Sequence, residues 1–153
     1  MKKVFYVLQL CLIILCSCGD DSEGDGGMNG GGKGFAPGEV VGKTLTLRKS
    51  NGGIYLSAEH LSASSVLVTS SDLVDYGKYP PSYTYSVTGN NKASYDLTVT
   101  KKVYVPYYGT YTYSKFVFDI NLTFISSSNG TYQGTQINGN GKESTILGSF
   151  ILN

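Results

Sequence analysis

Residues 92–100 (Lys-Ala-Ser-Tyr-Asp-Leu-Thr-Val-Thr) and residues 116–124 (Phe-Val-Phe-Asp-Ile-Asn-Leu-Thr-Phe) place a large apolar side chain at nearly every second position. A period of two puts alternate side chains on opposite faces of a β-strand, so each stretch predicts a strand with one buried face and one solvated face. Similar alternation, rich in Thr, Tyr, Val and Ile, extends outward in both directions along the chain. It recurs at residues 44–48, 54–56, 66–68, 83–88, 131–137 and 146–152.

These eight stretches are separated by short turn sequences such as Asn51-Gly52-Gly53 and Gly89-Asn90-Asn91. The only segment that suggests helix is a single turn at residues 57–61. Eight short antiparallel strands with local connections predict an all-β fold, either an up-and-down barrel or a β-sandwich. We favour the barrel, because closure protects the edges of a sheet so rich in Thr and Tyr. The predicted inward side chains are large, which favours a filled interior.

The pairing register of the two longest stretches follows from the parity of their apolar positions. A turn centred on Tyr107-Tyr108, between a proline and a glycine, opposes Leu97 with Phe118 and keeps both apolar sets on one face. The same register places Asp96 opposite Asp119 on the solvated face, where two like charges in direct opposition are destabilising.

The composition excludes several classes of function. The 153 residues include 12 basic and 11 acidic side chains, for a formal net charge of +1, and a single histidine. Binding of nucleic acid through phosphate neutralisation is therefore not expected. Metal sites and acid–base machinery built on several histidines are excluded, and we predict no metal, no cofactor and no enzymatic activity.

The amino-terminal segment is typical of a secretion signal. Lys2 and Lys3 precede a short apolar run at residues 4–15, which is below the roughly 20 helical residues that span a membrane. The run ends in Leu15-Cys16-Ser17-Cys18, which resembles the lipobox of bacterial lipoproteins. The resemblance implies that residues 1–17 are a signal peptide and that Cys18 carries lipid chains.

Residues 18–38 are dominated by glycine and predict a flexible tether, because they cannot bury enough apolar surface to offset their ordering entropy. Asp20, Asp21, Glu23 and Asp25 closely follow Cys18. This acidic run resembles the export signal of Bacteroidetes-type surface lipoproteins. It implies an outer-membrane protein displayed on the cell surface, with the periplasmic leaflet as the alternative. Residues 39–153 are the expected all-β domain.

Tyrosine is concentrated in one region, since ten of the 13 tyrosines lie between Tyr76 and Tyr113. Tyrosine suits surfaces that contact sugars or proteins, because its ring is apolar and its hydroxyl is polar. It also forms strands readily through cross-strand ring contacts, so a structural role stays open. The candidate contact surface comprises the five tyrosines around the predicted turn: Tyr104, Tyr107, Tyr108, Tyr111 and Tyr113.

Other candidates for chemistry are few. Asp96 and Asp119 could serve glycoside hydrolysis or bind a hard cation, but two solvated strand-face carboxylates are the simpler interpretation. Asp72 and Asp75 are interpreted as turn residues. His60 has no partners at a recognised catalytic spacing and is interpreted as a surface or turn residue.

The domain also resembles the lipocalin-like (calycin) barrels. The resemblance rests on the strand number, on Gly42-Lys43-Thr44 at the first strand and on the terminal strand at residues 148–152, without that group's opening tryptophan. The leading expectation is a lipid-anchored, non-catalytic binding or structural module. The alternatives are a carrier of a small hydrophobic ligand and a glycan-binding or glycan-processing surface protein. The expected partners are therefore a membrane, through Cys18, and a glycan, a protein or a small hydrophobic ligand.

Overall fold

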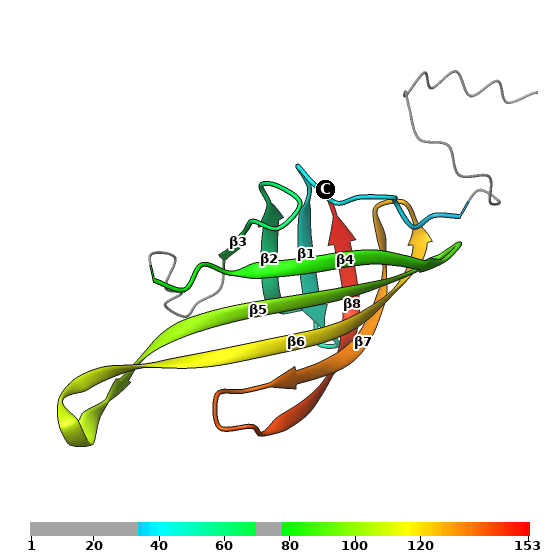
Figure 1. The fold of residues 1–153 in the computed structure, drawn as a ribbon. Coiled ribbons are helices and arrows are strands. Elements are labelled where there is room, and N and C mark those ends of the chain that lie inside the picture. The colour runs from blue at the N-terminus through cyan, green and yellow to red at the C-terminus, as the bar shows by residue number, and fades with distance from the viewer. Residues whose placement is uncertain (1–33, 70–77) are drawn as a thin grey trace, which may run out of the picture. The chain divides into compact units, whose positions relative to one another are not determined.

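The computed structural model describes residues 34–69 and 78–153, and within these ranges it forms one antiparallel sheet of eight strands (Figure 1). A single turn of 3-10 helix, η1 (Pro106–Tyr108), joins the two longest strands at the predicted turn. The strands are β1 (Thr44–Lys49), β2 (Ile54–His60), β3 (Val66–Thr69), β4 (Ser82–Gly89), β5 (Lys92–Val105), β6 (Thr110–Ser126), β7 (Asn129–Ile137) and β8 (Glu143–Leu152).

The strand order is that of a nearly closed up-and-down barrel. It runs β3-β2-β1-β8-β7-β6-β5-β4, so the first and last strands of the chain pair with each other. The break in the ring lies between β3 and β4, where an isolated bridge joins Ser65 to Ser82. The predicted all-β barrel is confirmed. The pairing of β1 with β8 joins the first and last strands of the chain and so protects one edge of each.

The predicted register of β5 and β6 is also confirmed. Leu97 pairs with Phe118, and Asp96 pairs with Asp119. The pairing continues from Lys92 to Val105 without a shift in register. The alternation of side chains therefore decides which face of this hairpin enters the barrel.

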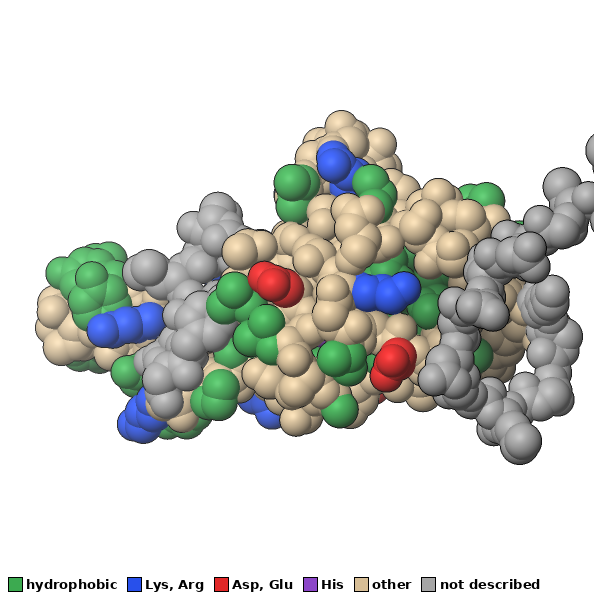
Figure 2. Space-filling view, turned by 90° about the horizontal axis from the view of Figure 1, so that it is seen from above, with side chains coloured by type: hydrophobic (Ala, Val, Ile, Leu, Met, Phe, Trp, Pro, Cys, Tyr) green, Lys and Arg blue, Asp and Glu red, His purple; other side chains and the backbone are tan. Residues whose placement is uncertain are grey.

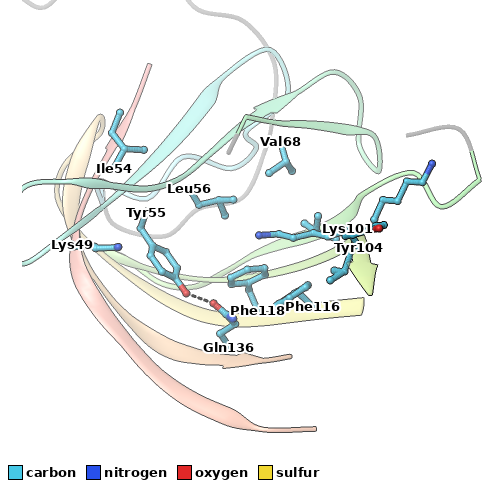
Figure 3. Close-up of a pocket in the computed structure, with 13 residues that line it drawn as sticks. Lys49, Ile54, Tyr55, Leu56, Val68, Lys101, Tyr104, Phe116, Phe118 and Gln136 are labelled. Atoms are coloured by element: carbon cyan, nitrogen blue, oxygen red, sulfur yellow. Dashed lines mark hydrogen bonds between the residues drawn. The ribbon is translucent and has the colours of Figure 1, made fainter. Parts of the chain in front are cut away.

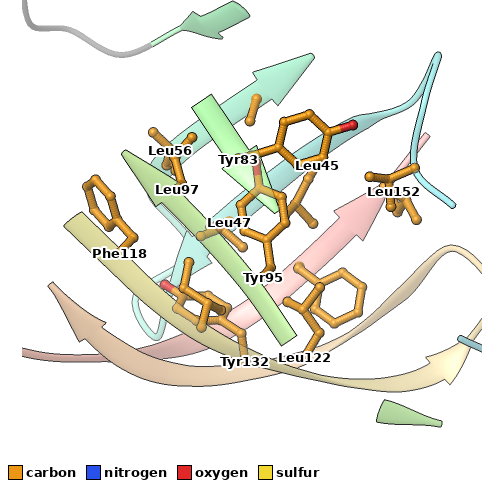
Figure 4. Close-up of a cluster of buried hydrophobic side chains, with 14 of the residues drawn as sticks. Leu45, Leu47, Leu56, Tyr83, Tyr95, Leu97, Phe118, Leu122, Tyr132 and Leu152 are labelled. Carbon is orange, nitrogen blue, oxygen red and sulfur yellow. The ribbon is translucent and has the colours of Figure 1, made fainter. Parts of the chain in front are cut away.

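The core fills the middle of the barrel. Tyr95 lies fully buried among side chains from several strands (Figure 4). The rings of Phe124 and Phe150 contact edge to face with centroids 4.9 Å apart. The expected filling of the interior by large side chains therefore holds in this region. The largest fully buried apolar side chains are Tyr95, Phe150, Leu45, Leu47, Leu97, Ile120, Leu122 and Val99.

Two glycines allow neighbouring strands to approach closely where the sheet curves. A Cβ atom at Gly134 in β7 would collide with the carbonyl oxygen of Asp119 in β6. A Cβ atom at Gly148 in β8 would collide with the carbonyl oxygen of Arg48 in β1. These positions need glycine because the backbone of the next strand occupies the space of a side chain.

The structure differs from the sequence-based expectation at residues 57–61. They form no helical turn, because Ser57 to His60 belong to β2, in which Ser57 to Glu59 pair with both β1 and β3 and His60 pairs with β3. Contacts with the barrel begin before the expected domain start at Glu39, since Phe35 and Ala36 donate backbone hydrogen bonds to the β4–β5 turn. Among the residues placed by the structure, there is no helix long and apolar enough to cross a membrane.

Candidate functional site

The two ends of the barrel differ. One end is covered by residues 34–43, which cross it and bury Val40. Ala36 donates a backbone hydrogen bond to the carbonyl of Asn90, and Tyr85 donates its hydroxyl proton to the carbonyl of Pro37 at 2.7 Å. We call this the closed end.

His60 lies at the closed end and is completely buried, so its interpretation as a surface or turn residue is wrong. Its Nδ1 atom lies 2.8 Å from the carbonyl oxygen of Lys43, and its Nε2 atom lies 3.0 Å from the Tyr95 hydroxyl. A carbonyl only accepts hydrogen bonds, so Nδ1 carries the proton and Nε2 accepts the proton of Tyr95. Burial lowers the pKa of His60, although the hydrogen bond to Lys43 opposes this shift, and burial raises the pKa of Tyr95. His60 is therefore a neutral structural group of the core.

The opposite end of the barrel holds an open pocket of about 680 Å³ (Figure 3). We call this the open-end pocket. It forms because β5 and β6 run on past their neighbours. β4 accompanies β5 only as far as Thr98, and β7 accompanies β6 only as far as Val117. The side chains that line it come from β1, β2, β3, β5, β6 and β7: Lys49, Ile54, Tyr55, Leu56, Val68, Val99, Lys101, Lys102, Val103, Tyr104, Phe116, Phe118 and Gln136.

The floor of the open-end pocket is apolar. Leu56, Val68, Val99 and Phe118 are all buried and form the outer layer of the core at this end. Apolar ligand surface placed against such a floor gains roughly 25 cal/mol for each Å² removed from water. The pocket can therefore accommodate an apolar body.

The wall of the pocket carries positive charge. Lys49 and Lys101 occupy inward positions of β1 and β5, and none of the described residues that line the pocket is acidic. The Lys49 ammonium lies 5.7 Å from the centre of the Tyr55 ring, and the Lys101 ammonium lies 4.8 Å from the centre of the Phe116 ring. A wall of this kind favours an anionic group on the ligand.

A shift in strand register places one polar group inside the pocket. The pairing of β1 with β2 passes from Leu47–Leu56 to Arg48–Ile54 and skips Tyr55, as at a β-bulge. The Tyr55 hydroxyl donates a hydrogen bond to Gln136 Oε1, and the Tyr55 ring contacts Phe118 edge to face (Figure 3). Burial raises the pKa of Tyr55, which keeps its hydroxyl protonated. Tyr55 and Gln136 therefore supply neutral polar groups beside the lysines.

The tyrosines predicted as a contact surface lie on the extended β5–β6 hairpin, away from the core. Tyr104, Tyr107, Tyr108, Tyr111 and Tyr113 are all exposed, and Tyr107 is 87% exposed. Whether they contact a partner stays a prediction. Tyr104 also lines the open-end pocket, so the two candidate regions adjoin.

Asp96 and Asp119 face each other across β5 and β6 as predicted, on the exposed outer face of the barrel. Thr84 Oγ1 donates a hydrogen bond of 2.9 Å to Asp96 Oδ2. The open-end pocket lies on the inner face, so the structure does not join this carboxylate pair to it. Within the described ranges, no three His, Cys, Asp or Glu side chains gather in a way that could hold a metal ion.

Five predictions concern residues outside the described ranges: the signal peptide at residues 1–17, the part of the tether at residues 18–33, lipidation of Cys18, the acidic run that follows it, and the turn roles of Asp72 and Asp75. Sequence reasoning did not find the open-end pocket. The available signal was Lys101, which continues the inward positions of Tyr95, Leu97 and Val99 with a charged residue.

Comparison with known proteins found no matching family model, no matching curated protein and no matching solved structure. The functional argument therefore rests on the sequence and on the geometry of the barrel.

Proposed function

We propose that this protein is a lipid-anchored binding module of the cell envelope, and that it does not catalyse a reaction. Its ligand is a small molecule with an apolar body and an anionic group, held in the open-end pocket. Among the sequence-based alternatives, this is closest to a carrier of a small hydrophobic ligand. The observation that carries the proposal is the pairing of a buried apolar floor with Lys49 and Lys101 in one pocket.

The size and chemistry of the pocket support this proposal. A volume of about 680 Å³ lies within the range of roughly 300–1,000 Å³ that small-molecule sites occupy. Lys49 and Lys101 project from β1 and β5, on opposite sides of the floor, so an anionic group between them would meet positive charge from two strands. Charge-assisted hydrogen bonds are stronger than neutral ones, so these lysines would fix the orientation of the ligand.

The proposed location rests on the amino-terminal sequence. Two or more acyl chains on Cys18 would anchor the protein stably, whereas a single chain binds a membrane only marginally. We place the protein on the outer membrane, exposed at the cell surface, with the periplasmic leaflet as the alternative. Residue 34, where the described chain begins, lies at the closed end, opposite the open-end pocket.

Native mass spectrometry of the protein purified from cells tests the binding proposal. We expect a co-bound mass that is released as an anion when the protein is unfolded. The double variant Lys49→Glu/Lys101→Glu should lose this mass, because an anion would then meet like charge. Lys142→Glu, a charge reversal in the exposed β7–β8 turn, is the matched control and should retain it. Equal occupancy in the double variant and the control would contradict the proposal.

A further inference from the structure

The extended part of the β5–β6 hairpin is a second surface, separate from the floor of the open-end pocket. We call residues 100–115 the arm. Among the described strands, β5 and β6 pair only with each other along the arm, because pairing with β4 stops at Thr98 and pairing with β7 stops at Val117. The arm extends beyond the rest of the barrel and is closed by η1 at its tip (Figure 1).

The register gives the arm an outer face built of tyrosine and lysine. Lys102 pairs with Tyr113, and Tyr104 pairs with Tyr111, on the face opposite to Val99 and Phe116. The rings of Tyr104 and Tyr111 lie 5.2 Å apart between centroids. At the tip, the rings of Tyr107 and Tyr108 lie 4.8 Å apart and are 87% and 71% exposed. A row of rings therefore runs along the outer face to the tip.

Positive charge accompanies these rings. The Lys102 ammonium lies 4.7 Å from the centre of the Tyr111 ring. The Lys78 ammonium lies 5.3 Å from the Tyr79 ring and 5.5 Å from the Tyr113 ring. Between Asp96 and Asp119 the sequence contains three lysines and no Asp or Glu. Seen from above, the outer end of the hairpin shows hydrophobic and basic side chains together (Figure 2).

The identity of the apolar groups indicates the chemistry of the partner. From Pro106 to Ser114 the sequence is Pro-Tyr-Tyr-Gly-Thr-Tyr-Thr-Tyr-Ser, with no Leu, Ile, Phe or Trp. Every aromatic ring of the tip thus carries a hydroxyl, and the two tyrosines of β6 alternate with Thr110 and Thr112. A surface that inserts among acyl chains uses Leu, Phe or Trp, whereas tyrosine is found at membrane–water interfaces and at protein and sugar contacts. A surface that offers ring faces and hydroxyls together matches a ligand with C–H faces and hydroxyls, which is a sugar.

We propose that the arm binds an acidic polysaccharide. The tyrosine rings stack on the C–H faces of successive sugar units, and Lys102 binds carboxylate or sulfate groups along the chain. A linear polymer suits a row of rings, because each additional ring adds a contact of the same kind. This surface goes beyond the proposed small-molecule site, which lies on the inner face of the same hairpin.

Biolayer interferometry with the full chain in a non-ionic detergent tests this proposal. Sensors carry biotinylated polygalacturonate, chondroitin sulfate or the neutral polymer dextran. We expect binding to at least one acidic polymer and none to dextran. Raising the salt concentration should weaken the binding, because salt screens exposed charges.

Variants distinguish binding by the arm from non-specific attraction of an acidic polymer to basic side chains elsewhere on the protein. Tyr107→Ser/Tyr108→Ser should weaken binding about tenfold, equal to about 1.4 kcal/mol. Lys102→Gln should also weaken it and should reduce the salt dependence. Lys142→Gln removes the same charge from the β7–β8 turn and should bind as the unchanged protein does. Thermal unfolding of each variant shows whether the barrel is intact.

Three results would overturn the proposal. The first is the absence of binding to every acidic polymer, and the second is equal binding by the tyrosine double variant and the unchanged protein. The third comes from flotation with phosphatidylglycerol and phosphatidylcholine vesicles. An acyl anchor inserts into both, so the readout is the extra binding to the anionic vesicles. If the tyrosine variant loses that extra binding and keeps its polysaccharide binding, the arm contacts membranes instead.

Discussion

Lowering the pH from 7.5 to 5.5 is expected to destabilise the barrel through His60. The ring is completely buried, with Nδ1 donating to the Lys43 carbonyl and Nε2 accepting from the Tyr95 hydroxyl. A proton on Nε2 would put a charge in the core and would oppose the Tyr95 proton. Burial therefore holds the pKa of His60 below its usual value of 6.5 in the folded state.

The sign and size of the effect follow from proton linkage. Between the lowered folded pKa and the unfolded value, the unfolded state binds more protons than the folded state. Stability is therefore complete above pH 6.5 and falls as the pH drops below it. One proton changes the free energy of unfolding by at most about 1.4 kcal/mol per pH unit, so with an unfolded pKa of 6.5 the loss between pH 7.5 and pH 5.5 is at most about 1.4 kcal/mol.

Urea unfolding followed by tyrosine fluorescence measures this loss, because the chain contains no tryptophan. The interpretation is simple, since the sequence contains only one histidine and ordinary carboxyl groups titrate below this range. His60→Gln should be less stable at both pH values but should lose less than half as much between them. An unchanged free energy in the natural protein, or an equal loss in His60→Gln, would refute the assignment of His60 as a buried neutral group.

Five further outcomes are expected. Leu47→Ala should lower the free energy of unfolding by about 2–5 kcal/mol, because it opens a cavity at a fully buried position, and an effect below about 1 kcal/mol in urea unfolding would contradict the packing. Tyr107→Ser/Tyr108→Ser should leave the melting temperature unchanged within about 2 °C, and a larger loss would show that these rings are packed. Gly134→Ala should destabilise the barrel by more than about 1 kcal/mol, whereas a neutral result would mean that β6 and β7 can separate at little cost. Cys18→Ser should abolish labelling by radioactive palmitate and release the protein from membranes. Protease treatment of intact cells should cleave the anchored natural protein if it is displayed at the surface, and protection would place it in the periplasmic leaflet.

The sequence predicts the barrel well where alternation is strict. In β5 and β6, the parity of Leu97 and Phe118 with a turn at Tyr107-Tyr108 was enough to predict the register. Local pattern alone could not show that Lys101 and Lys49, from strands distant in sequence, line the same pocket. That depends on closure through β1 and β8, and on how far β5 and β6 extend past β4 and β7.

His60 shows a different limit. Its position continues the inward side of β2 after Leu56 and Ala58, so periodicity favoured burial. A histidine without an identified partner was nevertheless interpreted as exposed. The partners that allow its burial are the Lys43 carbonyl and the Tyr95 hydroxyl, which the chain brings together only when the barrel closes.

The most direct test of the proposed function is calorimetric titration of residues 31–153, which form one compact unit, with octanoate and with 1-octanol. The two ligands share an apolar chain and differ in charge. We predict one octanoate bound per barrel, at least about fivefold tighter than 1-octanol, with this preference lost in Lys49→Glu/Lys101→Glu and kept in Lys142→Glu. Equal affinity for both ligands, or no heat of binding from either, would contradict the assignment of the open-end pocket as a site for anionic apolar ligands.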